Sequence, residues 1–71
     1  MEKRTISIDT EYIKLDSLLK LADAVSTGGE AKLLIRDGRV AVNGETCTQR
    51  GKKLRPGDRA VLEDAVEITV A

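Results

Sequence analysis

The chain has 71 residues, with twelve basic and twelve acidic side chains, no histidine, one cysteine and a single tyrosine as its only aromatic residue. A chain of this length forms one small domain, and its core must consist of leucine, isoleucine, valine and alanine. It has no apolar run of the roughly 20 residues that cross a bilayer and no signal peptide, so we expect a cytoplasmic protein without membrane association. Cys47 cannot form an internal disulfide, and without histidine we expect no metal site and no cofactor.

The charges are unevenly distributed along the chain. Residues 1–30 carry four basic and six acidic side chains, residues 31–59 carry eight basic and three acidic ones, and the last twelve residues carry three acidic ones only. Because salt screens charges beyond about 10 Å, the basic middle of a neutral chain can still bind a polyanion. The alternative for any single run of charges is an ordinary solvated surface.

The start of the chain predicts an edge strand followed by a short helix. Residues 5–8 alternate polar and apolar side chains, and residues 12–13 are expected to extend beside them. From Leu15 onward the apolar side chains follow helical spacing, and Leu21 and Val25 are expected to widen the apolar face of this helix.

A second helix is predicted to begin at Gly28, because Thr27 and Glu30 stand at the spacing of a capping box. Its apolar side chains also recur at helical spacing, and Gly38 ends it, since glycine tolerates the left-handed conformation just past a helix. Side chains three and four positions apart lie on one helix face. Three cations are therefore expected to form one basic stripe: Lys32, Arg36 and Arg39.

The second half of the chain predicts short strands joined by tight turns. Asn43 and Gly44 are a strong hairpin signal, because both turn positions need positive φ. Residues 50–53 form a basic loop, and Pro56 and Gly57 stand where a type II turn needs them. The strands are expected at residues 40–42, 45–48, 60–62 and 66–70, the last two joined by a turn at residues 63–64.

These motifs occur in the order of a known family. They are Leu15-Asp16, Thr27-Gly28, the Gly-x-Val-x-Val-Asn-Gly hairpin of residues 38–44, the basic residues 50–53 and the Pro-Gly-Asp turn of residues 56–58. Over about residues 13–62 the chain resembles the RNA-binding domain named after the fourth small-subunit ribosomal protein, also called the alpha-L motif, and in detail its small free-standing bacterial members, known as YaaA-like or YbcJ-like proteins. The resemblance implies an α+β fold with two short antiparallel helices packed on a small, mostly antiparallel sheet.

The resemblance also implies a partner and an RNA surface. The partner is structured RNA, with ribosomal RNA or a ribosomal particle as the expected target and ribosome assembly or translation as the expected role. Family positions on or beside the RNA surface fall on Lys14, Thr27, Lys32, Arg36 and Asn43, and charge placement adds Arg39, Arg50, Lys52 and Lys53. Larger members carry arginine directly after the capping serine. Here Gly28 and Gly29 stand instead, and their backbone N–H groups are expected to meet a phosphate.

Two other classes of function remain open beside RNA binding. No set of catalytic residues is visible, so the chain is expected to be a non-catalytic binding protein and a monomer. A protein-interaction adaptor could use the same basic face on an acidic partner. A β-grasp sulfur carrier shares the Asn-Gly and Pro-Gly-Asp turns, but such proteins end in Gly-Gly, whereas this chain ends in Thr-Val-Ala. Tyr12 could stack on a base, although a lone aromatic residue beside a helix more commonly belongs to the core or an edge.

Overall fold

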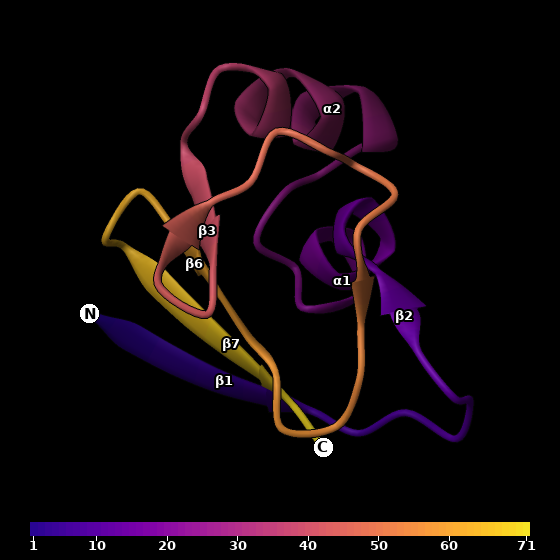
Figure 1. The fold of residues 1–71 in the computed structure, drawn as a ribbon. Helices are drawn as coiled ribbons and strands as arrows, with labels where there is room; N and C mark the ends of the chain where they lie inside the picture. Colours follow the sequence, from indigo (N-terminus) through magenta and orange to yellow (C-terminus); the bar gives the residue numbers. More distant parts are fainter.

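Two short helices lie against one face of a five-stranded sheet in the computed structural model, which describes residues 1–71 (Figure 1). Only the first and last strands of the chain pair in parallel, and all other neighbours are antiparallel. The predicted α+β fold with a mostly antiparallel sheet is confirmed. In spatial order the strands are β1 (Glu2–Ile6), β7 (Val66–Val70), β6 (Arg59–Leu62), β3 (Val40–Val42) and β4 (Glu45–Thr46).

The helices are α1 (Leu15–Leu21) and α2 (Gly28–Arg36), and a separate two-stranded ladder lies directly before α1. This ladder joins β2 (Ile13–Lys14) to β5 (Lys53–Leu54) in antiparallel register. The prediction that residues 12–13 extend beside residues 5–8 is wrong, because Ile13 pairs with Leu54 instead. A strand of two residues is too short to display a periodic pattern, so nothing local in the sequence indicates its partner.

The edge strand is confirmed as an edge, but it begins and ends earlier than predicted, at Glu2 and Ile6. Its three charged residues, Glu2 to Arg4, hide the alternation that the sequence shows only from Thr5 onward. β1 pairs along its whole length with β7, from Glu2 opposite Val66 to Ile6 opposite Val70. Beyond its end, the N–H of Ile8 still donates to the carbonyl of Ala71 over 3.0 Å, which ties the two ends of the chain together.

The core contains fifteen buried residues, all of them apolar, and no buried charged or polar side chain. Leu21 and Val25 were both expected to widen the apolar face of α1, but Leu21 is 59% exposed, and Val25 is buried at a position beyond the end of the helix. Leu21 follows the buried Leu19 by two positions, and a helix turns about 100° per residue, so the two side chains point in nearly opposite directions. The largest fully buried side chains are those of Leu15, Leu18, Leu19, Ile35, Val40, Leu54, Ile68 and Val70.

The predicted turns have the expected backbone geometry. Asn43 and Gly44 have φ values of 52° and 89°, and they join β3 to β4 in a two-residue hairpin. The return strand is shorter than predicted and ends at Thr46. Gly57 has a φ of 100°, as position three of a type II turn requires. These turns fix where the flanking basic segments lie.

Candidate nucleic-acid interface

The start of α2 is held by side-chain caps. The hydroxyl oxygen of Thr27 accepts from the backbone N–H of Glu30 over 3.1 Å, as the capping box predicts. The carboxylate of Glu30 reaches one residue further back than expected and accepts from the N–H of Ser26 over 2.7 Å. This carboxylate places a negative charge beside the first helical N–H groups, so the helix start is not purely electropositive.

Gly28 and Gly29 are exposed, and the surrounding space does not demand glycine at either position. A Cβ atom built on Gly28 would lie 3.8 Å from the Cδ of Lys20, and one on Gly29 would lie 3.8 Å from the Oγ1 of Thr27, which are ordinary van der Waals distances. The two glycines therefore leave the first two positions of α2 without a side chain, although no steric conflict requires this.

Lys32 and Arg36 lie exposed on α2, but Arg39 does not extend their stripe along the helix. The helix ends at Arg36, and Gly38 follows with a φ of 76°, so the backbone has already turned away before Arg39. The guanidinium of Arg39 donates to the carboxylate of Glu63, which projects from the β6–β7 turn. This hydrogen bond and the charge of Glu63 raise the pKa of Arg39 above its usual value.

The basic loop of residues 50–53 is attached to the start of α1. The N–H of Leu15 donates to the carbonyl of Lys52 over 2.9 Å, and the N–H of Asp16 donates to the carbonyl of Arg50 over 3.1 Å. Because these carbonyls satisfy the first N–H groups of α1, the helix needs no side-chain cap, and its N-cap residue Lys14 provides none. The loop is thus fixed by its backbone, which leaves its long basic side chains exposed.

The β2–β5 ladder brings two lysines face to face. Lys14 stands directly opposite Lys53, and both are exposed, while their neighbours Ile13 and Leu54 face the core. The ammonium of Lys53 also lies 4.8 Å from the centre of the Tyr12 ring. The sequence predicts Lys53 in a loop and does not indicate its contact with Tyr12, because that contact depends on pairing between segments some forty residues apart.

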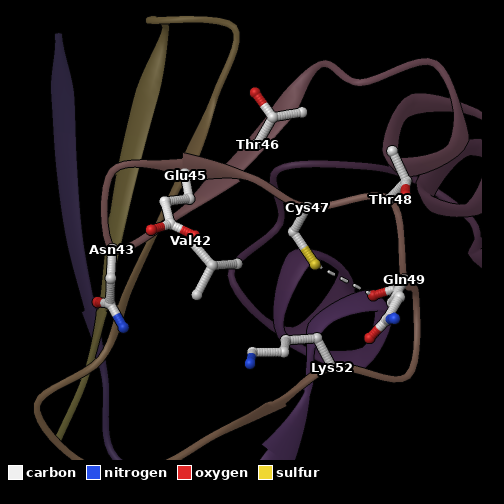
Figure 2. Close-up of a pocket in the computed structure, with 8 residues that line it drawn as sticks. All are labelled: Val42, Asn43, Glu45, Thr46, Cys47, Thr48, Gln49 and Lys52. Carbon is white, nitrogen blue, oxygen red and sulfur yellow. Dashed lines mark hydrogen bonds between the residues drawn. The ribbon is translucent and has the colours of Figure 1, made fainter.

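A shallow hollow of about 420 Å³ opens between the β3–β4 hairpin and the segment that leads to Lys52 (Figure 2). Glu45 borders it from the hairpin and Lys52 from the other side, and the thiol of Cys47 turns to the carbonyl of Gln49 over 3.6 Å. Its lining is mainly polar, so it suits a hydrated polar group better than an apolar ligand. The remaining lining residues are Val42, Asn43, Thr46 and Thr48.

Asn43 and Asp58 lock the hairpin to the Pro-Gly-Asp turn. The amide nitrogen of Asn43 donates to one carboxylate oxygen of Asp58 over 3.1 Å, and its amide oxygen accepts from the N–H of Arg59 over 3.0 Å. The other oxygen of Asp58 accepts from the N–H of Arg55 over 2.8 Å. The side chain of Asn43 is therefore already engaged within the protein. Sequence reasoning identified both turns but not the bond between them.

The hydrogen bonds that the Asp58 carboxylate accepts from Asn43 and Arg55 predict a loss of stability in acid. The hydrogen bond from Arg55 and then that from Asn43 lower the pKa of Asp58 below its ordinary 3.8, so the folded state favours the charged form. This stability is present above the unfolded pKa and is lost as the pH falls through the lower folded pKa. At pH 7, Asp58→Ala should reduce the free energy of unfolding by about 1–2 kcal/mol, and the difference from wild type should shrink below about pH 4. Urea titrations at several pH values measure it, and a pH-independent difference would contradict the lock.

The sequence pattern of the family described as S4 domain matches residues 6–71. The chain belongs to the S4 domain family. The resemblance drawn from the alpha-L motif is thereby confirmed, and the match extends further at both ends than the predicted residues 13–62. The S4 domain of this chain is also similar to the probable ribosome maturation protein RlbA of Bacillus subtilis (strain 168). The two are 48% identical over 58 residues, which cover 82% of this chain and 82% of that protein.

Ion pairing divides the candidate cations of this S4 domain into two groups. Arg36 lies 3.8 Å from the carboxylate of Asp37, and Arg39 is bonded to Glu63. The other five have no carboxylate within the 4.0 Å that defines an ion pair, and all are exposed: Lys14, Lys32, Arg50, Lys52 and Lys53. Four of these five belong to the ladder and the loop at the start of α1.

No helix of the S4 domain is long and apolar enough to span a bilayer.

Proposed function

We propose that this S4 domain binds structured RNA, with ribosomal RNA as the target and ribosome maturation as the role, in the bacterial cytoplasm. The observation that carries the proposal is the group of exposed cations without carboxylate partners, four of them gathered at the start of α1. An ion pair between exposed side chains adds little to the stability of a protein. Cations that have no carboxylate partner keep their charge available to neutralise phosphates. The similarity to RlbA supports the ribosomal target.

Recognition in this proposal rests on shape and phosphate contacts. The deep major groove of A-form RNA is closed to side chains, and with one tyrosine the chain lacks the several aromatic residues of a single-strand reader. Lys14, Arg50, Lys52 and Lys53 form the centre of the interface, and Lys32 and Arg36 extend it along α2. Thr27, Gly28 and Gly29 contribute backbone N–H groups at the helix start.

Two of the proposed residues are already hydrogen-bonded within the protein. Arg39 must exchange the carboxylate of Glu63 for a phosphate, which is feasible for a pair that is exposed on both sides. Asn43 keeps both its hydrogen bonds and contributes only its remaining amide hydrogen. Both therefore stand at the margin of the interface.

Salt titration tests the proposal directly. If about five phosphates are neutralised, log affinity should fall against log salt with a slope of order −4. Labelled structured RNA is titrated at several salt concentrations against the wild type and against Lys32→Ala/Arg36→Ala, for which we expect weaker binding and a slope smaller by about 2. Equal, salt-insensitive binding by both proteins would overturn the basic interface.

Crosslinking in cells, followed by sequencing of the bound RNA, tests the target. Recovery of ribosomal RNA supports the proposed role in ribosome maturation. The adaptor function uses the same cations on an acidic protein, and recovery of protein without RNA would favour it. In this proposal the protein binds RNA and catalyses no reaction.

A further inference from the structure

The pairing of Lys14 with Lys53 is unfavourable for the protein on its own. Residues directly opposite in an antiparallel pair have Cβ atoms about 5 Å apart, and like charges at that position destabilise the ladder. Neither lysine has a carboxylate within ion-pair distance. Glu11, three positions before Lys14, is 3.7 Å from Arg55 instead, and the carboxylate of Asp16, two positions after Lys14, accepts from the N–H of Ser17. An anion placed between the two ammonium groups would turn this repulsion into attraction.

Tyr12 lies on the same side of the ladder as the two lysines. Lys14 has extended backbone geometry, and in extended chain side chains two positions apart point to the same side, which places Tyr12 beside Lys14 and away from the core-facing Ile13. The contact between the Lys53 ammonium and the Tyr12 ring, at 4.8 Å, confirms this arrangement. The hydroxyl of Thr10 donates to the carbonyl of Tyr12 over 2.9 Å and holds the backbone at this point.

Two cations and one aromatic ring on a single surface match the chemistry of one nucleotide. We propose that Tyr12, Lys14 and Lys53 form a site for an unpaired nucleotide, in which the base stacks on the Tyr12 ring and the phosphate lies between the two lysines. This site rests on the proposed function and makes it more specific, because the RNA must then carry an unpaired base beside the structured region.

When the nucleotide binds, the contact between Lys53 and the Tyr12 ring is replaced by two others: the base stacks on the ring, and the phosphate contacts Lys53. In the free protein the Lys53 ammonium occupies the ring, and an exposed cation–π contact is weaker than the stacking of a base on an aromatic side chain. A nucleotide displaces the ammonium from the ring and offers it a phosphate, which is a stronger partner for a cation than a ring in water. Lys53 thus covers the ring until RNA arrives.

Binding of two RNA hairpins that share the same stem distinguishes the contribution of the stacking site from that of the rest of the interface. One is blunt, and the other ends in a short run of unpaired adenosines. Tyr12→Leu should weaken binding of the second hairpin by about 5- to 100-fold and leave binding of the blunt one unchanged. Tyr12→Phe keeps the ring and should bind both hairpins like the wild type.

A fluorescent variant reports stacking without relying on affinity. The chain has no tryptophan, so Tyr12→Trp introduces one at a single known place, which can be excited beyond the absorption band of RNA. Its emission should change with the overhanging hairpin and not with the blunt one at equal saturation. This readout decides the proposal even if Tyr12→Leu fails to fold.

The outcomes separate the two proposals. If the wild type binds neither hairpin, the proposed RNA-binding function fails. If it binds both, while Tyr12→Leu binds the overhanging hairpin equally well and the emission of Tyr12→Trp stays constant, the general interface survives and the nucleotide site is overturned. A loss of affinity for both hairpins alike in Tyr12→Leu would also overturn it, because that result indicates a structural role for the ring.

Discussion

Replacement of Leu54 by alanine should lower the free energy of unfolding by about 2–5 kcal/mol. The Leu54 side chain is completely buried, and alanine leaves a cavity in a core that holds no aromatic residue able to move in and fill it. A domain of this length buries only about 60% of the surface of its unfolded chain, so this loss is a large part of its total stability. Urea unfolding at pH 7 measures the change.

The same substitution should also weaken RNA binding, because Leu54 holds the strand that carries Lys53 in the proposed interface. Leu54 is the only core residue of β5, and its partner Ile13 packs against the same core. Leu33→Ala is the matched control, since it removes the same atoms from a side chain that is 49% exposed on α2. We expect that variant to stay within about 0.5 kcal/mol of the wild type. Similar losses from both substitutions would contradict the assignment of Leu54 to the core.

Features of the fold that depend on neighbouring residues were predicted correctly from the sequence. The start of α2 follows from the hydroxyl of Thr27 and the carboxylate of Glu30, both of which act within one helical turn. The β3–β4 turn follows from Asn43 and Gly44, which adopt positive φ more readily than other residues. Such signals need only a few consecutive residues, so one sequence is sufficient to identify them.

Features that join distant segments were not predicted. The β2–β5 ladder is two residues long on each side and depends on the carbonyls of the basic loop meeting the start of α1. The Asn43–Asp58 lock joins side chains fifteen positions apart, and the guanidinium of Arg4 on β1 donates to the carbonyl of Ala22 at the end of α1. Two of these contacts matter for the site, because they place the loop cations and fix the hairpin. A single sequence shows the residues but not their pairing.

The basic stripe shows how one residue counted beyond a helix end changes a functional prediction. Arg39 stands three positions after Arg36, which would place it on the same face if α2 continued. Gly38 ends the helical geometry one residue earlier, as predicted, so Arg39 lies outside the helix. Among the candidate cations without a carboxylate partner, Lys32 alone lies on α2, and the other four are at the start of α1 and in the loop attached to it.

Removal of the charges of Lys14 and Lys53 together should have the largest effect on RNA binding. Each phosphate contact changes the salt slope by about 0.9, which corresponds to roughly tenfold in affinity at 0.1 M salt. Lys14→Gln/Lys53→Gln should therefore bind structured RNA about 10- to 100-fold more weakly, with a slope smaller by nearly 2. Fluorescence anisotropy over a series of salt concentrations measures both quantities.

The stability of the same variant distinguishes loss of contacts from loss of structure. Relief of the repulsion between the two lysines should gain about 0.2–1 kcal/mol, and loss of the Lys53–Tyr12 contact should cost about 0.5–1 kcal/mol, so the free energy of unfolding should hardly change. Lys3→Gln/Arg59→Gln is the control, since it removes two exposed cations from β1 and β6 and changes the net charge equally. If this control lost as much affinity, net charge alone would explain the binding. Lys14 and Lys53 face each other without a carboxylate between them, so their repulsion raises the free energy of the folded protein. An anionic ligand can relieve this repulsion, which adds to its affinity. Lys14→Gln/Lys53→Gln removes that source of affinity, whereas Lys3→Gln/Arg59→Gln does not.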